Sequence, residues 1–313
     1  MVNSPKNRPR HPHRLLSARR QILRPTRDGA AQQAALAAMR GALEKAGFDL
    51  TQFDEMRAQS RAELRTALAS YRAAADKRAP AMHEVVARSG EHWLRSNRVV
   101  SELAPADGFY SVGAADSITA TSNIDLSART IAPFANTAQI TLDQEDESLT
   151  EFLEFLFSWQ NPTGQDLMCT LTAVLGVTAT AIVTADSYWS PLSVNPISKL
   201  DVDALFDITL VDAFGNITSP PYQSTQAQGV AELVVEGALF EGTIAGQDIF
   251  RGYVLQYTDL MVPAGAELDL SVGCEMYTLA IDGGCQFVAA GDGRELSAFG
   301  VFINTEPASS SAA

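Results

Sequence analysis

From about residue 106 onward, the sequence consists of short apolar stretches separated by turn residues, with no helical pattern between them. Glycine and proline mark the boundaries, for example in NPTG (161–164) and VPAG (262–265). Many stretches alternate apolar and polar positions and are rich in β-branched residues, as strands are. Strands joined by turns pair antiparallel, so we expect a sandwich or jelly roll.

Twelve strands are expected in this part of the chain. The apolar spacing of SLTEFLEFLFSW (148–159) fits a helix as well as a strand, and we favour a strand because a tight turn and a clear strand follow. Trp159 and Cys169 are expected to face one hairpin around Asn161-Pro162. The expected strands are 108–112, 116–126, 137–142, 151–160, 166–175, 177–185, 204–212, 230–239, 250–259, 266–279, 285–290 and 297–304.

The segment 167–185 has nineteen residues and no charge, a length that would span a bilayer as a helix. Threonines take even positions while apolar residues take the odd ones, which is the period of a strand. Asp166 and Asp186 flank it where basic anchors would be expected. We predict two consecutive strands, broken near Gly176, and no membrane span.

Residues 30 to 94 have a helical composition, so the chain as a whole belongs to the α+β class. Gly47 is expected to cap a first helix, Thr51 to begin a second, and Pro80 to end it or open a third. These helices are rich in alanine and bury little apolar area, which favours packing against a copy or a neighbour over a self-contained bundle. The expected apolar faces are Leu50, Phe53, Leu64, Leu68 and Tyr71 in the second helix and Met82, Val85, Val86, Trp93 and Leu94 in the third.

Charge divides the chain sharply. Residues 1–100 hold 19 basic and 9 acidic residues, a net charge of +10, whereas residues 101–313 hold 4 basic and 28 acidic residues, a net charge of −24. Such asymmetry is typical of an interaction tail joined to a differently charged body. We expect an extended basic arm at 1–29, a helical segment at 30–104, the sandwich at 105–306 and a flexible tail at 307–313.

The arm contains eight basic residues and no acidic one between Met1 and Arg27. It matches the minimal electrostatic footprint of a nucleic-acid binder, but it lacks an aromatic residue for base stacking. An acidic protein surface suits it equally, and the body of another copy supplies one, so we favour protein over nucleic acid. The expected partner-binding residues are Arg8, Arg10, Arg14, Arg19, Arg20, Arg24 and Arg27.

No motif for catalysis or cofactor binding is present, so we expect neither an enzyme nor a cofactor. All four histidines lie within the first hundred residues, which leaves the acidic body without an imidazole. The acidic runs DQEDE (143–147) and DVD (201–203) are expected to be solvated turns. They are also calcium candidates through oxygen ligands, although the first lacks the order of a calcium loop. These candidates are Asp143, Glu145, Asp146, Asp201 and Asp203.

Three cysteines exclude a disulfide framework. Free buried thiols are favoured, and one bridge between Cys274 and Cys285 stays open if the two lie across a hairpin.

Arm, helices and acidic sandwich together predict a non-enzymatic structural subunit of a large particle, such as a phage or virus capsid, tail or appendage. Its location would be the virion or an extracellular particle, and the cytoplasm during assembly. The alternative is a glycan-binding adhesin whose site uses the loop aromatics Tyr188, Trp189 and Tyr222. A third hypothesis is a pore-forming protein that inserts 167–185 as a β-hairpin.

Overall fold

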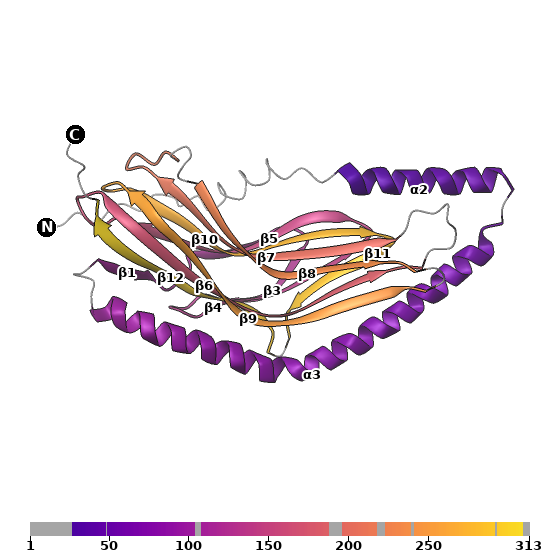
Figure 1. The fold of residues 1–313 in the computed structure, drawn as a ribbon, viewed down its shortest axis with the longest axis horizontal. Coiled ribbons are helices and arrows are strands. Elements are labelled where there is room, and N and C mark those ends of the chain that lie inside the picture. Colours follow the sequence, from indigo (N-terminus) through magenta and orange to yellow (C-terminus); the bar gives the residue numbers. More distant parts are fainter. Residues whose placement is uncertain are drawn as a thin grey trace.

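The computed structural model describes residues 27–47, 49–103, 108–187, 196–217, 223–238, 241–291 and 293–308. These residues form two helices followed by two antiparallel β-sheets packed as a sandwich (Figure 1). The predicted fold class is therefore confirmed. The arm residues Arg8 to Arg24 lie outside the described residues, and Arg27 is the first residue of α2.

The larger sheet has the strand order β1-β12-β4-β11-β6-β9, and β3 pairs with β4. The smaller sheet has the order β2-β5-β10-β7-β8. The strands are β1 (Phe109–Val112), β2 (Ser117–Ala120), β3 (Ile124–Thr130), β4 (Asn136–Glu145), β5 (Ser148–Gln160), β6 (Leu167–Ala185), β7 (Ile197–Val211), β8 (Gln223–Glu236), β9 (Thr243–Val262), β10 (Glu267–Ile281), β11 (Gly283–Ala289) and β12 (Glu295–Pro307).

The core lies between the two sheets and is filled by alternate side chains of every long strand. Phe155 and Phe157 of β5 face Leu171 and Leu175 of β6 across one continuous cluster. Residues 148–160 form a strand, so the interpretation of the ambiguous segment is confirmed.

The helices differ from the sequence-based expectation. Helix α2 spans Arg27–Lys45, and α3 runs without interruption over Thr51–Leu103 with Pro80 inside it. Pro80 therefore neither ends a helix nor begins one. Figure 1 shows that α3 bends where the loop between β11 and β12 reaches it, and that loop brings Gly293 against Pro80. A proline inside a helix removes one hydrogen bond and produces such a bend.

The face that α3 buries packs on this chain's own larger sheet, along β6 and β9, rather than forming a bundle. Leu64 and Val86 are buried in this contact, as their spacing predicts. Met82 and Val85, which were expected on the same apolar face, are 37% and 57% exposed in this chain. The side chains of Phe53, Trp93 and Leu94 are not among those described.

Residues 167–185 form one strand, so the predicted break at Gly176 is wrong. The strand lacks charge because one of its faces lines the core while the other lies under α3; even Thr178 and Thr180 are buried. Strands β5 and β6 belong to different sheets, so the turn at 161–166 crosses between sheets and the predicted hairpin is wrong as well. Among the described residues, no helix has the length and apolarity that crossing a membrane requires.

Candidate functional site

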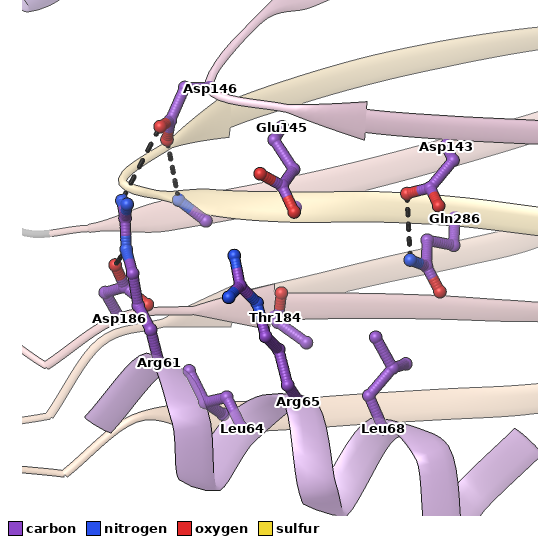
Figure 2. A pocket seen from close by; sticks show the side chains of 12 residues that line it. Arg61, Leu64, Arg65, Leu68, Asp143, Glu145, Asp146, Thr184, Asp186 and Gln286 are labelled. Carbon is purple, nitrogen blue, oxygen red and sulfur yellow. Dashed lines mark hydrogen bonds and ion pairs between the residues drawn. The ribbon is translucent and has the colours of Figure 1, made fainter. Parts of the chain in front are cut away.

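Among the described residues, most ion pairs between distant parts of the chain join α3 to the larger sheet. Arg61 Nε lies 2.5 Å from Asp186 Oδ2, directly after β6. Arg61 Nη2 also lies 3.6 Å from Asp146 Oδ2, in the turn between β4 and β5 (Figure 2). The Asp186 side chain is 5% exposed, so this carboxylate depends on its partners for charge compensation.

Three further ion pairs follow α3 along the sheet. Arg72 Nη2 lies 3.6 Å from Asp143 Oδ2. Arg78 Nε donates to Asp248 Oδ2 at 2.9 Å, while Thr180 donates to the other oxygen of that carboxylate. These pairs connect the basic helical segment to the acidic sandwich within one chain. The last pair joins Asp76 to Arg294 of the β11–β12 loop.

Glycines on β9 and just before it let α3 approach closely. A Cβ atom on Gly242 would lie 2.5 Å from Leu64, and one on Gly246 would lie 2.5 Å from the ring of Tyr71. A side chain at either position would force Leu64 or Tyr71 of α3 to move.

A cavity of about 60 Å³ remains between α3 and the sheet, lined by Arg61, Leu64, Arg65, Leu68 and the acidic ends of β4 and β6 (Figure 2). This volume holds a few water molecules. The contact is therefore a structural junction, and its arginines hold the helix in place.

A larger hollow of about 470 Å³ lies over β7 and β8. A β-bulge places Val230 as an extra residue between Gly229 and Ala231, opposite Val202 and Asp203. Bulges bend a strand and redirect its side chains, which opens the surface here. The polar side chains of the hollow are Asp201, Asp203, Glu232 and, from β9, Gln247.

The hollow contains three carboxylates, and Lys199 neutralises part of their negative charge. Lys199 Nζ lies 2.7 Å from Asp201 Oδ2 and 3.7 Å from Glu232 Oε1. The hydrogen bond to Asp201 raises the pKa of Lys199, which keeps it charged. Burial, followed by the charges of Asp201 and Glu232, raises the pKa of Asp203 above its ordinary value. The site thus offers carboxylate and amide groups to a ligand rich in hydrogen-bonding groups.

The predicted calcium candidates do not come together. Asp143, Glu145 and Asp146 lie at the end of β4 in the larger sheet, and Asp201 and Asp203 lie on β7 in the smaller one. Within the described part of the chain, no group of three or more His, Cys, Asp or Glu side chains is arranged to hold a metal ion. Calcium binding stays an untested prediction.

Other predicted positions fall outside the described residues. These are Arg8, Arg10, Arg14, Arg19, Arg20 and Arg24 of the arm and the loop aromatics Tyr188, Trp189 and Tyr222. Sequence reasoning missed the partners that α3 uses. Arg61 and Arg72 pair with acids more than 70 positions away, and nothing in the sequence indicates these partners.

All three thiols are free and buried, so Cys274 and Cys285 form no bridge. Burial raises the pKa of Cys169 and of Cys285 to about 12. These thiols are therefore protonated at neutral pH and unsuited to nucleophilic chemistry.

No family model and no curated protein matches this sequence. Among solved structures, the chain resembles the C-terminal family 22 carbohydrate-binding module of Clostridium thermocellum Xyn10B, at 13% identity and a TM-score of 0.19 over 64% of this chain and 95% of that one. It also resembles a xylan-binding domain of Paenibacillus barcinonensis Xyn10C, at 12% identity and a TM-score of 0.20 over 64% and 94% of the two chains. A structure of infectious bursal disease virus matches at 11% identity and a TM-score of 0.17 over 61% and 40%. Values this low support no inference about function.

Proposed function

We propose that the chain is a non-enzymatic carbohydrate-binding protein that takes its ligand in the hollow over β7 and β8. The observation that carries the proposal is the hollow itself, with about 470 Å³ bordered by Asp201, Asp203, Glu232 and Gln247. Small-molecule sites occupy about 300–1,000 Å³. Carboxylate and amide groups at fixed positions match the hydroxyl groups of a sugar, which both donate and accept hydrogen bonds.

The negative charge of the hollow also favours some classes of glycan over others. Net negative charge disfavours phosphate, sulfate and uronic acid groups, which would require a basic lining. Neutral polysaccharides are therefore the first class to test.

The test is binding of the full chain to a panel of neutral and acidic glycans, with isothermal titration of any positive ligand. Asp201→Asn combined with Gln247→Ala should weaken binding at least about tenfold, since each lost polar contact costs roughly 1 kcal/mol. The matched control is Asp125→Asn, an exposed carboxylate on β3 of the other sheet. Equal binding by all three proteins, or no binding to any glycan, would contradict the proposal.

A second candidate, a structural subunit of a particle, is favoured by the charge division between residues 1–100 and 101–313. Exchange of basic arms among acidic bodies is a low-cost route to assembly. Exposed apolar side chains on α3 and β9, such as Val85 and Val254, add area for contacts between copies. Light scattering at micromolar concentration and physiological salt tests this candidate, and a stable monomer would argue against it.

A further inference from the structure

The hollow over β7 and β8 carries more negative charge than its neighbouring lysine balances. Asp201, Asp203 and Glu232 supply three carboxylates and Lys199 supplies one ammonium group, which leaves a net charge of −2. Within the part of the chain that the structure describes, Lys199 is the one basic residue that pairs with any of these carboxylates. Neighbouring carboxylates repel one another, and a cation placed among them relieves that repulsion. The charge of the hollow therefore favours a ligand with a positive group.

Lys199 shows which kind of positive group these carboxylates hold. Asp201 and Glu232 face each other across β7 and β8. The ammonium nitrogen of Lys199 lies 2.7 Å from Asp201 Oδ2 and 3.7 Å from Glu232 Oε1, so one ammonium group is shared by both carboxylates. Asp203 lies on the same face of β7, two residues and therefore roughly 6.5 Å further along the strand. A third carboxylate is thus available beyond the reach of this lysine.

Asp203 is also open to a ligand from the side of β8. Its partner across the two strands is Gly229, which is exposed. A Cβ atom on Gly229 would lie 3.9 Å from Asp203 Oδ1, and apart from the chain neighbours of Gly229 no other atom lies within 4 Å of that position. The missing side chain of Gly229 therefore leaves space for a small group directly beside the carboxylate of Asp203.

The electrostatics around Asp203 point the same way. Burial is the first cause that raises the pKa of Asp203, and the charges of Asp201 and Glu232 follow. The negative potential of these two charges attracts an ammonium group as it attracts a proton. Glu275 of β10 lies opposite Asp203 in the register, so a further acidic residue borders Asp203 on the side away from β8.

We propose that the carbohydrate bound in the hollow carries a free amino group, and that Asp203 holds this group as an ammonium in the space beside Gly229. The inference rests on the proposed carbohydrate site and names the class of sugar that the site takes, which is an amino sugar without an N-acetyl group. Lys199 already neutralises part of the charge of Asp201 and Glu232, so Asp203 is the carboxylate that distinguishes an amine from a hydroxyl. Asp201, Glu232 and Gln247 accept or donate hydrogen bonds to the sugar hydroxyls.

Three sugars with the same backbone separate charge from shape. In β-1,4-linked oligomers of glucosamine, glucose and N-acetylglucosamine, the group at carbon 2 is an ammonium, a hydroxyl or an acetamide. The ammonium and the hydroxyl are similar in size but differ in charge. The acetamide is neutral and larger, so it fits the space beside Gly229 less well than either.

The test is isothermal titration of the full chain with the three trisaccharides at pH 6.5. The amino group is mostly protonated there, because amines next to polar substituents, such as α-amino groups, have pKa values of about 7.7–8.0. The glucosamine trimer should bind at least about tenfold more tightly than the glucose trimer, since hydrogen bonds to charged groups are stronger than neutral ones. A concentration of 0.5 M NaCl should reduce this preference.

Two variants test the role of Asp203 in different ways. Asp203→Asn removes the charge and should bring the two affinities within about twofold of each other. Gly229→Val fills the space beside Asp203 without a change in charge, at an exposed strand position that a β-branched residue suits, and it should abolish the preference as well. The matched control, Asp125→Asn, makes the same charge change on β3 of the other sheet and should keep the preference. The control accounts for the general attraction of a cation to a chain with a net charge of −14.

Equal affinities of the wild type for the glucosamine and glucose trimers would overturn the inference and leave carbohydrate binding in the hollow standing. A preference that persists in both Asp203→Asn and Gly229→Val would overturn it too, because the amino group would then bind elsewhere. No binding of any of the three trimers would also overturn it, while the wider glycan panel decides the proposed function separately.

Discussion

Arg61 and Asp186 are 125 positions apart in sequence and meet where α3 crosses the end of β6. Their exposures differ, at 39% for the arginine side chain and 5% for the carboxylate. Losing the arginine would leave a buried charge, whereas losing the carboxylate would leave a cation that water can solvate. Breaking the pair therefore costs more stability when the arginine is removed, because the carboxylate that remains is buried.

Arg61→Gln is expected to lower the free energy of unfolding by about 2 kcal/mol, less than a fully buried pair because the arginine is part-exposed. Urea denaturation followed by circular dichroism measures this change. The control is Arg88→Gln, whose pair with Glu84 is exposed on both sides. It should cost less than about 0.5 kcal/mol. Equal losses in the two variants would show that Arg61 contributes nothing beyond a surface pair.

Asp203 should make stability depend on pH. Its pKa is raised in the folded protein, first by burial and then by Asp201 and Glu232, so the fold binds this proton more tightly than the unfolded chain does. Stability is therefore lost as pH rises from the ordinary aspartate range through the raised pKa. Asp203→Asn removes that loss and should stabilise the protein at pH 7 by on the order of 0.5 kcal/mol.

The gain from Asp203→Asn should disappear near pH 3, roughly where aspartate is protonated in both states. Urea titrations of the wild type and the variant at both pH values provide the comparison. A gain of equal size at the two values would rule out titration of Asp203 as its cause.

The three thiols also allow a test of burial. With pKa values of about 12 at Cys169 and Cys285, the native protein should show no reaction with a disulfide reagent at pH 8 over an hour. In denaturant all three cysteines should react. One reactive thiol instead of three in denaturant would indicate an intramolecular bridge.

At the scale of elements, close approach of α3 to β9 depends on glycine. Gly246→Ala would place a Cβ 2.5 Å from the Tyr71 ring and should cost about 1–3 kcal/mol in unfolding free energy. Gly252→Ala in the same strand is the matched control, since nothing lies within 4 Å of its Cβ position. It should be neutral or slightly stabilising. Similar stabilities of the two variants would mean that the helix is not held tightly against Gly246.

The strands were predictable because period-two alternation and turn residues are local signals. Residues 148–160 were assigned correctly from such signals even though their apolar spacing was ambiguous. The same signals misplaced the boundary at Gly176, because a glycine inside a buried strand permits close packing as well as a turn: its Cβ position lies 3.2 Å from Val86 of α3.

Long-range pairing was not predictable from local pattern. The tight turn at 161–166 looks like a hairpin, yet it crosses between sheets, since β5 pairs with β2 and β10 while β6 pairs with β9, β11 and β12. Pro80 was expected to end a helix or open one, but it lies inside α3, where Gly293 and the buried Ala79 pack at the bend. The hollow at β7 and β8 depends on a bulge that no residue pattern signals.

At the scale of the whole molecule, α3 and the sandwich are mutually dependent. Strand β6 is apolar on both faces, and its outer face is covered by α3. Detaching the helix would expose Val174, Ile182 and the neighbouring buried threonines to water. Exposing apolar surface costs about 25 cal/mol of free energy per Å². The helix in turn has a thin apolar face that would not be stable alone in water. The helix has no core of its own, and the sandwich needs the helix to cover the outer face of β6, so the two should unfold together.

Hydrogen exchange under native conditions should therefore give residues 60–86 of α3 the same opening free energy as β6, close to the global value. Helix α2 packs mainly through β10 and should exchange at a lower free energy. Increasing urea should merge the α3 and β6 amides into one isotherm with the slope of global unfolding. An α3 isotherm that stays separate, with a small slope, would instead describe a helix that detaches from a sandwich stable on its own.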